Sequence, residues 1–177
     1  VCLDQALGRA APPPRRYLIL IRLPETGFNI VLFEPEIPAN TGNIGRLCVG
    51  AGANLHIILP CRFLLTDKAL KRAGLDYWQD LSLTVHKSMD ELYAAFPRDR
   101  IFYCSTKAEK SYLDLDYKPN DAFVFGPESR GLPQELLDQN KERCITIPMH
   151  PKIRSLNLAN SVSIILYEAI RQTLLNR

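Results

Sequence analysis

The fold is decided by the stretch Ala122-Phe123-Val124-Phe125-Gly126-Pro127-Glu128-Ser129-Arg130-Gly131-Leu132-Pro133. Its first four residues are apolar and predict a buried strand, and two glycines with two prolines follow closely. Glycine adopts backbone conformations closed to other residues and lets a ligand approach the main chain. A glycine-rich turn after a parallel strand is where open α/β sheets usually bind ligands. The stretch therefore predicts either a ligand-binding loop or a plain strand-to-helix turn with Pro133 at the first helical position.

Short apolar runs alternate with helical segments over most of the chain. Strands are predicted at residues 29–33, 55–59, 83–85, 101–104, 122–125 and 144–147. Helices are predicted from about residue 41 or 43 to 50, and at residues 66–73, 88–96, 133–138 and 157–175. Residues 105–120 are predicted to form a long polar loop. This order predicts an α/β fold with a mostly parallel six-stranded sheet flanked by helices.

Length and composition place the chain among soluble globular proteins. Its 177 residues suffice for one ordinary domain, and 46% hydrophobic with 23% charged residues is typical of that class. The main domain is predicted at residues 27–177. Residues 1–26 are predicted to be an N-terminal extension, either a flexible arm or a segment foreign to the native chain. No apolar run reaches the length of a membrane span, so no membrane partner is expected.

Charge and cysteine usage narrow the function classes. A net charge of +3 and a pI of about 8.6 permit an RNA partner without requiring one. The five cysteines are an odd number without a C-x-x-C pair, which indicates reduced thiols in a cytoplasmic protein. The three histidines are scattered along the chain. We therefore expect neither a disulfide framework nor a metal site.

Three common ligand motifs are absent or incomplete. Gly126 and Gly131 have the spacing of a P-loop, but Leu132 stands where Lys is needed and Pro133 where Ser or Thr is needed. A nucleoside triphosphate would lack its cationic clamp and its metal ligand there. No G-x-G-x-x-G follows a strand and no G-x-S-x-G occurs. These absences disfavour a dinucleotide-binding fold and a hydrolase nucleophile elbow.

Three loop motifs occur in order along the chain. The first spans residues 38–46, Pro-Ala-Asn-Thr-Gly-Asn-Ile-Gly-Arg, and the second is residues 125–131 of the stretch quoted above. The third comprises residues 147–149, Ile-Pro-Met, and residues 155–161, Ser-Leu-Asn-Leu-Ala-Asn-Ser. Together they closely resemble the motifs of the SPOUT class of RNA methyltransferases, and within it those of the small, single-domain 2′-O-ribose methyltransferases of the TrmL group. The resemblance covers about residues 28–171.

The resemblance implies a fold and a cofactor. Members of this class fold as an α/β domain whose C-terminal chain threads a loop to form a deep trefoil knot, which the general rules of chain connection disfavour. The knot loops bind S-adenosylmethionine, mostly through backbone groups. By resemblance, cofactor contacts are expected at Cys104, Gly126, Ile147 and Ser155. For Cys104 a buried strand thiol is the plain interpretation, and it is compatible with binding through the backbone.

Arg46 matches the arginine of the first motif, which implies a catalytic role. The implied reaction is attack of a ribose 2′-hydroxyl on the methyl group of a sulfonium. The guanidinium pKa is too high for an ordinary base, so we expect Arg46 to orient the nucleotide and stabilise the developing alkoxide or a neighbouring phosphate. A charge on a helix surface is the plain alternative. Other polar residues match motif positions and either support the site or cap loops and helices: Asn40, Glu128 and Asn157.

The resemblance also implies partners. The protein is expected to act as a homodimer on tRNA, methylating the wobble nucleotide, a cytidine or modified uridine, of leucine tRNAs. Arg154 and Lys152, in the basic loop before the last helix, are candidates for RNA phosphate contacts or are plain solubilising charges. Two alternatives stay open. One is the same chemistry on another tRNA site or on ribosomal RNA, and the other is a non-catalytic RNA-binding protein that keeps the knot.

Overall fold

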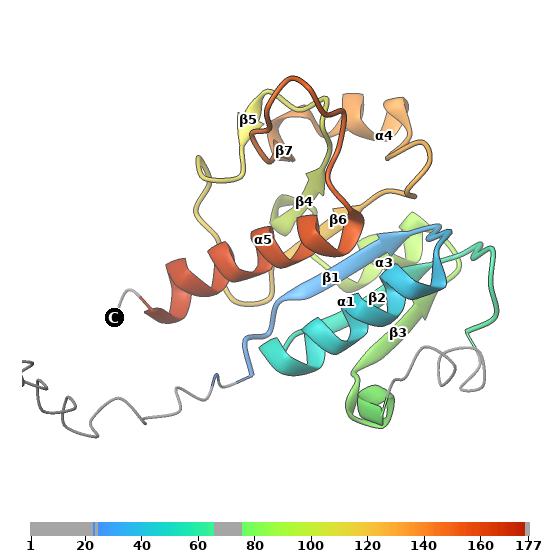
Figure 1. Cartoon of the computed structure of the whole chain (residues 1–177). Coiled ribbons are helices and arrows are strands. Elements are labelled where there is room, and N and C mark those ends of the chain that lie inside the picture. Colours follow the sequence, from blue (N-terminus) through green and yellow to red (C-terminus); the bar gives the residue numbers. More distant parts are fainter. Residues whose placement is uncertain (1–22, 24, 66–75, 176–177) are drawn as a thin grey trace, which may run out of the picture.

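The structure, a computed structural model, describes residue 23, residues 25–65 and residues 76–175. The helix predicted at residues 66–73 and all but three residues of the predicted extension lie outside this part of the chain. Within it, one parallel sheet lies between two layers of helices (Figure 1). The α/β class and the parallel sheet are therefore confirmed. Among the helices of the described residues, none is long enough and apolar enough to cross a membrane.

The sheet has seven strands in the order β3-β2-β1-β6-β4-β7-β5, and each neighbouring pair is parallel. The strands are β1 Asn29–Phe33, β2 Asn54–Ile58, β3 Leu83–His86, β4 Ile101–Cys104, β5 Lys110–Ser111, β6 Ala122–Phe125 and β7 Cys144–Thr146. The prediction of six strands was wrong by one, because β5 lies in the segment predicted as a polar loop. Its two polar residues pair with β7 through the backbone at the sheet edge, so no apolar run marks them.

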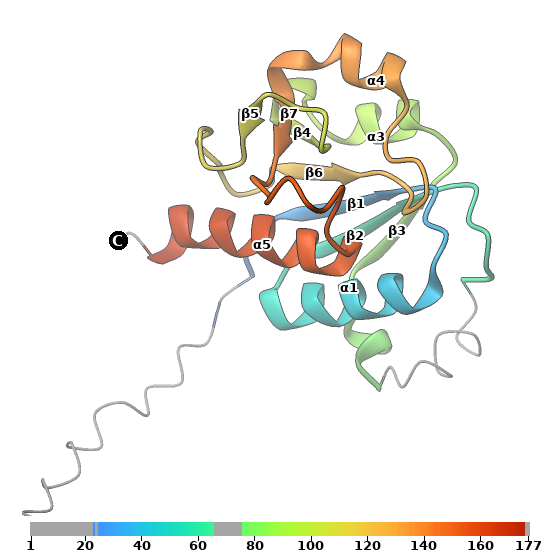
Figure 2. The same cartoon turned by 45° about the horizontal axis from the view of Figure 1, so that its top comes forward.

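The helices divide between the two faces of the sheet (Figure 2). Helices α1 and α5 cover one face together, and α3 and α4 cover the other. The α-helices are α1 Pro38–Ala51, α3 Met89–Ala95, α4 Gln134–Gln139 and α5 Leu158–Ile170. Shorter turns are the 3₁₀ segments η2 Asp76–Asp80, η3 Arg98–Arg100 and η4 Lys141–Arg143, and the π-helical η5 Arg171–Leu175 continues α5.

Helix α1 begins earlier than predicted. It starts at Pro38 instead of residue 41 or 43, because proline at the first helical position has a suitable φ and lacks an N–H that would need a partner. Its N-cap residue, Ile37, offers no capping side chain, and the Glu128 carboxylate accepts the Ile37 backbone N–H at 3.3 Å instead. The helix ends as predicted, at Gly52 in the left-handed conformation with φ 61°.

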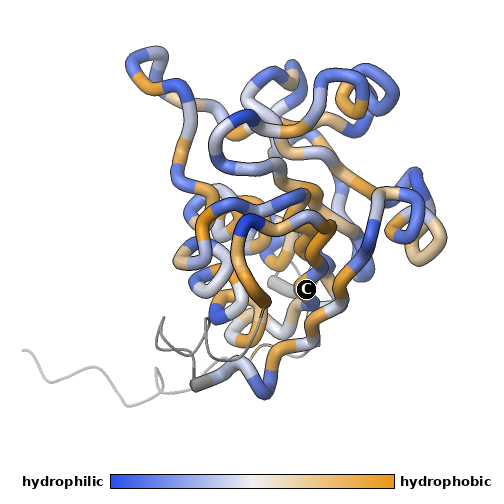
Figure 3. Tube along the Cα trace, turned by 90° about the vertical axis from the view of Figure 1, so that its right-hand side faces the viewer, coloured by the Kyte–Doolittle hydropathy of each residue, from blue (hydrophilic) through white to orange (hydrophobic). Residues whose placement is uncertain are grey.

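Each face of the sheet has its own apolar core. On the α1 and α5 side, Ile30 and Leu32 of β1 pack with helix residues that include Ile44 and Val162. On the other side, Val31 belongs to the cluster that packs under α3 and α4. This alternation follows from the opposite directions of successive strand side chains. In Figure 3 the apolar residues concentrate along the central elements, and the outer loops are mainly hydrophilic.

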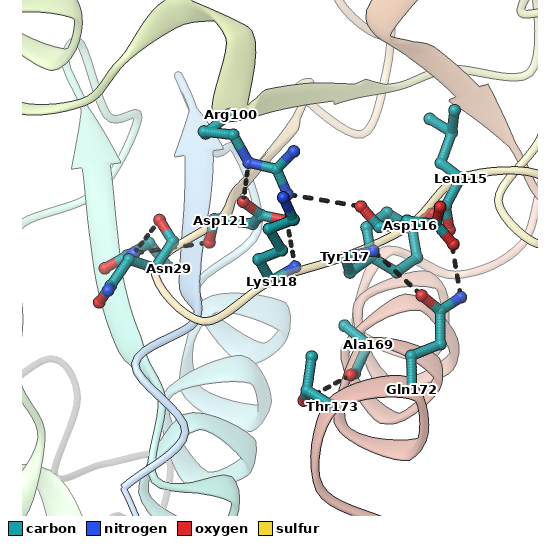
Figure 4. A network of polar contacts seen from close by, with 11 residues as sticks. Asn29, Arg100, Leu115, Asp116, Tyr117, Lys118, Asp121, Ala169, Gln172 and Thr173 are labelled. Atoms are coloured by element: carbon teal, nitrogen blue, oxygen red, sulfur yellow. Dashed lines mark hydrogen bonds and ion pairs between the residues drawn. The ribbon is translucent and has the colours of Figure 1, made fainter. Parts of the chain in front are cut away.

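A polar network closes the amino ends of β4 and β6 (Figure 4). The Arg100 guanidinium donates to both carboxylate oxygens of Asp121, at 2.6 Å and 2.5 Å, and the backbone N–H of Lys118 donates to the same carboxylate at 2.7 Å. Gln172, after α5, accepts the Tyr117 backbone N–H at 3.0 Å. These bonds tie the β4–β6 connection to the end of the last helix.

Candidate active site

A cavity of about 530 Å³ opens at the carboxyl ends of β4, β6 and β7. This is the end of a parallel sheet at which α/β proteins bind ligands, and the volume is within the range of small-molecule sites. Its walls are the three strand ends, the loop 126–132 after β6, the loop 147–157 after β7, and the amino ends of α1 and α5. Residues 125–132 thus form one wall of the cavity.

The four residues expected to contact a cofactor all line this cavity: Cys104, Gly126, Ile147 and Ser155. They come from three separate segments of the chain, which the parallel sheet brings to one edge. Of the two candidates for RNA contacts, Arg154 lines the cavity and Lys152 does not. Sequence analysis missed Thr106 and Leu132, which also line it. Thr106 follows a predicted strand closely, and that position could have identified it.

Gly126 is required by the loop itself. A Cβ at this position would lie 2.3 Å from the backbone nitrogen of Leu132 and 2.4 Å from the carbonyl carbon of Gly131. Real Cβ atoms do not approach backbone so closely, and backbone cannot rotate away like the end of a flexible side chain. The glycine therefore lets residues 126–132 fold back on themselves, which also leaves main chain facing the cavity.

The three polar motif residues form one hydrogen-bonded relay along the cavity wall. Asn157 donates from Nδ2 to Asn40 Oδ1 at 3.0 Å, and Asn40 donates from Nδ2 to Glu128 Oε1 at 3.0 Å. Asn157 also caps α5, because its Oδ1 accepts the backbone N–H of Ala159 at 2.9 Å. The interpretation as caps and the interpretation as site support are thus compatible, since the relay joins all three motifs.

Two glutamates clamp the first motif to the second. Glu128 Oε2 accepts the Glu36 backbone N–H, and Glu36 Oε2 accepts the Ser129 backbone N–H, both at 2.9 Å. The hydrogen bond from Ser129 lowers the pKa of Glu36, which favours the ionised form of that carboxylate. A third carboxylate, that of Glu34, is paired with Arg130. The loop before α1 and the loop after β6 are therefore held together by carboxylates from both sides.

Cys104 does not provide a reactive thiolate. Burial raises the pKa of its thiol well above the ordinary value, and the neighbouring Cys144 raises it further. The thiolate is the nucleophilic form of cysteine, so covalent chemistry at Cys104 is disfavoured. Its place in the wall is consistent with a backbone or packing role. In the described part of the chain, no three His, Cys, Asp or Glu side chains cluster closely enough to hold a metal ion.

Arg46 lies outside the cavity of its own chain. It is exposed on α1, about 9 Å along the helix axis from Asn40, which does line the cavity. Its guanidinium lies over the ring of Tyr77, with Cζ at 5.5 Å from the ring centroid. The fold therefore places the predicted catalytic arginine on an exposed helix face and not among the residues that line the cavity of this chain.

Comparison with known proteins identifies the family. The SpoU rRNA Methylase family matches residues 27–167. The tRNA (cytidine(34)-2′-O)-methyltransferase of Methylovorus glucosotrophus is 49% identical over 146 residues, 82% of this chain and 95% of that protein. The protein of the same name from Escherichia coli K12 is 48% identical, covering 81% of this chain and 92% of its own length.

Solved structures agree with this assignment. One, from a study of 2-OH methylation of C/U34 on tRNA, has a TM-score of 0.78 and 44% identity, covering 85% of this chain and 97% of that chain. An AdoMet-bound rRNA methyltransferase from Sinorhizobium meliloti shares the fold at 24% identity and a TM-score of 0.72, covering 85% of this chain and 58% of that chain. The resemblance to the TrmL group of SPOUT methyltransferases is thus confirmed, and the chain belongs to the SpoU rRNA methylase family.

Proposed function

We propose that this protein transfers a methyl group from S-adenosylmethionine to the ribose 2′-hydroxyl of the wobble nucleotide, a cytidine or modified uridine, of leucine tRNAs. The observation that carries the proposal is the convergence of the expected cofactor residues, Cys104, Gly126, Ile147 and Ser155, on one cavity. Relatives that are 48% and 49% identical are named tRNA (cytidine(34)-2′-O)-methyltransferases, which supports the substrate and the position.

The lining of the cavity suits S-adenosylmethionine. Apolar side chains at the strand ends, among them Phe125, Ile145 and Ile147, suit the flat face of an adenine. The main chain at Gly126 and the hydroxyls of Thr106 and Ser155 supply polar groups on other walls. When bound, the cofactor supplies an electrophilic methyl group on a sulfonium. The residues of this chain that line the cavity would hold the cofactor, and Arg154 and the loops at its rim would orient the ribose toward it.

We assign Arg46 to the nucleotide rather than to the cofactor. A guanidinium does not accept a proton near neutral pH, but it stabilises negative charge on an alkoxide or a phosphate. Since Arg46 is exposed and does not line its own cavity, we propose a homodimer in which Arg46 of one subunit serves the cavity of the other. Arg154, at the cavity, and Lys152, two residues earlier, are proposed to contact RNA phosphates.

Further proposals concern the domain and its topology. We propose that residues 27–177 form the methyltransferase domain and that residues 1–26 are an extension, of which Thr26 touches the domain through a hydrogen bond to Gly52 at 2.7 Å. We propose that loops 126–132 and 147–157 are interlaced in a deep trefoil knot. Family membership supports the knot, and both loops line one cavity. We also propose a cytoplasmic location, which a tRNA substrate supports.

Methyl transfer is tested with labelled S-adenosylmethionine and total tRNA from a strain that lacks the endogenous activity. We expect label on the wobble nucleotide of leucine tRNAs, located by nuclease mapping. Label at another tRNA position, or on ribosomal RNA only, would support the alternative substrate. Absence of transfer together with absence of cofactor binding in calorimetry would leave a non-catalytic RNA-binding protein.

The division of labour between subunits is tested by complementation. Arg46→Ala should lower the rate of methyl transfer by about 100-fold or more while cofactor binding is retained. Gly126→Val should block the cavity but leave Arg46 intact. Dimers that contain one subunit of each kind have one complete site, so mixing the two inactive variants should restore activity. If activity does not return although mixed dimers form, Arg46 does not serve the partner's cavity.

A further inference from the structure

We propose that Tyr77 is a positioning residue that holds the guanidinium of Arg46 in its working orientation. The inference rests on the proposed function, which assigns Arg46 to the nucleotide. It identifies a second residue on which that role depends, outside the three loop motifs. Tyr77 belongs to the 3₁₀ turn η2, thirty-one residues further along the chain than Arg46.

The turn η2 packs closely against α1 at a position where the helix has no side chain. A Cβ on Gly45 would lie 3.1 Å from Cζ3 of Trp78 and 3.2 Å from Cδ2 of Leu81. These distances are tighter than nine in ten real Cβ contacts, so with a side chain at Gly45 the Trp78 and Leu81 side chains would have to give way by a few tenths of an ångström. Glycine in this helix position therefore allows η2 to approach, and Tyr77 comes with it.

The Tyr77 side chain contacts two residues of α1 that lie one helical turn apart. Its hydroxyl donates to the carbonyl oxygen of Gly42 at 3.4 Å, and its ring lies under the Arg46 guanidinium, with Cζ at 5.5 Å from the ring centroid. Gly42 and Arg46 are four residues apart, so they are neighbours on one face of the helix. The ring lies along that face, with its hydroxyl near Gly42 at one end and its π surface toward the guanidinium.

The contact between Tyr77 and Arg46 restricts the guanidinium before a negatively charged group binds to it. An exposed arginine side chain populates many rotamers, and ordering it on binding costs conformational entropy. A guanidinium that already lies over an aromatic ring has lost part of that freedom before the substrate arrives. The contact with the ring face leaves N–H donors of the guanidinium available for an alkoxide or phosphate oxygen. The arrangement therefore preorganises Arg46 without neutralising it.

Two substitutions separate the ring from the hydroxyl. Tyr77→Leu removes the π surface and is expected to lower the single-turnover rate of methyl transfer to tRNA by about ten-fold. The dissociation constant for S-adenosylmethionine, measured by calorimetry, should stay within about two-fold, because Tyr77 lies outside the cavity. Tyr77→Phe keeps the ring and should retain a rate within about three-fold of the wild type.

A control uses Tyr93, a second tyrosine of the described residues that lies under an arginine. The Tyr93 ring lies under Arg98, with Cζ at 4.0 Å from the ring centroid, and Tyr93 does not line the cavity. Tyr93→Leu removes this contact together with the hydrogen bond to Tyr103 at 3.1 Å, and it should leave the methyl-transfer rate unchanged. Thermal unfolding of every variant shows whether a rate loss merely follows a loss of stability. If Tyr77 only packed η2 on α1, its leucine variant would lose stability and not rate.

The outcomes distinguish the inference from the function on which it rests. If Arg46→Ala is as active as the wild type, the role of Arg46 itself is wrong. If Arg46→Ala is inactive and Tyr77→Leu is fully active, only the positioning role of Tyr77 is overturned. Equal rate losses in Tyr77→Leu and Tyr77→Phe would overturn it as well, because the hydroxyl and not the ring would then matter.

Discussion

The two ends of the sheet carry polar networks built from similar bonds, and they differ in what they enclose. At the amino end, Arg100 and the Lys118 backbone N–H satisfy a carboxylate, Asp121, that is only 1% exposed. At the carboxyl end, the Glu128 carboxylate accepts the Glu36 backbone N–H and the Glu36 carboxylate accepts the Ser129 backbone N–H, which joins two loops beside the cavity. The first network closes the core, and the second holds together two loops that border the cavity.

The two networks also differ in whether every buried carboxylate oxygen accepts a hydrogen bond. Glu36 Oε1 is buried and has no hydrogen-bond donor among the described residues, although Arg62 lies 3.2 Å away in an ion pair. The Arg62 side chain is 70% exposed, so solvent screens this pair. Polar networks that only stabilise a fold tend to give every buried polar group a hydrogen-bond partner. Buried polar groups without such a partner occur more often at functional sites. We therefore expect changes at the amino end to affect stability and changes at the carboxyl end to affect cofactor binding.

Removal of the arginine at the amino end should give the largest effect on stability. Arg100→Ala leaves the buried Asp121 without its cationic partner, and burial already raises the pKa of that carboxyl. We expect a loss of about 4 kcal/mol in the free energy of unfolding, measured by urea denaturation, with an unchanged dissociation constant for S-adenosylmethionine. Arg98→Ala, an exposed neighbour, should cost less than about 1 kcal/mol. A weakened cofactor affinity in the Arg100 variant would break the comparison.

Lowering the pH should also weaken the amino-end network, because it protonates a buried histidine. Asn29, which donates to Asn120 O, also accepts from the buried His56, whose Nδ1 lies 3.0 Å from His86 Nε2. Burial, assisted by His86, lowers the pKa of His56 to about 4.

Because this value lies below the unfolded pKa of about 6.5, the stabilisation is complete above pH 6.5 and is lost as the pH falls toward 4. The loss should reach about 3 kcal/mol. Urea denaturation at several pH values measures it, and His56→Leu should flatten the profile. A wild-type stability that is independent of pH between 7 and 4 would contradict the burial argument.

Blocking the carboxyl-end loop should affect binding and spare the core. Gly126→Val forces a side chain against the backbone of Gly131 and Leu132, so the cavity wall must shift. We expect roughly 100-fold weaker binding of S-adenosylmethionine in calorimetry. Gly50→Ala is a matched control, because a Cβ at that helix position meets nothing within 4 Å, and it should bind normally. Normal binding by the valine variant would separate this loop from the cofactor.

Breaking the hydrogen-bonded relay should give the smallest effect, part of it on the free energy of unfolding and part on the affinity for S-adenosylmethionine. Asn157→Ala removes the cap of α5 and the hydrogen bond to Asn40. We expect a loss of about 1 kcal/mol in the free energy of unfolding. A several-fold weaker affinity for S-adenosylmethionine should accompany it, because Asn40 and Asn157 both line the cavity. Asn160→Ala, an exposed neighbour in the first turn of α5, should change neither quantity.

Residues of the cavity wall were easier to predict from the sequence than the hydrogen bonds that hold the wall in place. Cys104, Gly126 and Ile147 were expected at the site because the three loop motifs resemble those of the SPOUT methyltransferases, and each of them lies at or just after the end of a strand. The partners of Glu128 could not be found, since they lie near residues 36–40, about ninety residues away. The early start of α1 was missed for the same reason, because its capping carboxylate belongs to another loop. Strand β5 was missed because its pairing involves only backbone.

The sequence by itself determined the α/β class, the identity of the motif loops and the glycine that lets one loop fold back, because apolar periodicity and backbone freedom are properties of neighbouring residues. Only the tertiary structure decided that Asn157, Asn40 and Glu128 form one relay and that Glu36 and Glu128 clamp two loops. It also placed Arg46 outside its own cavity and over Tyr77. The physical reason is that hydrogen bonds and ring contacts depend on distances in space, which the parallel sheet sets by bringing remote strand ends to one edge.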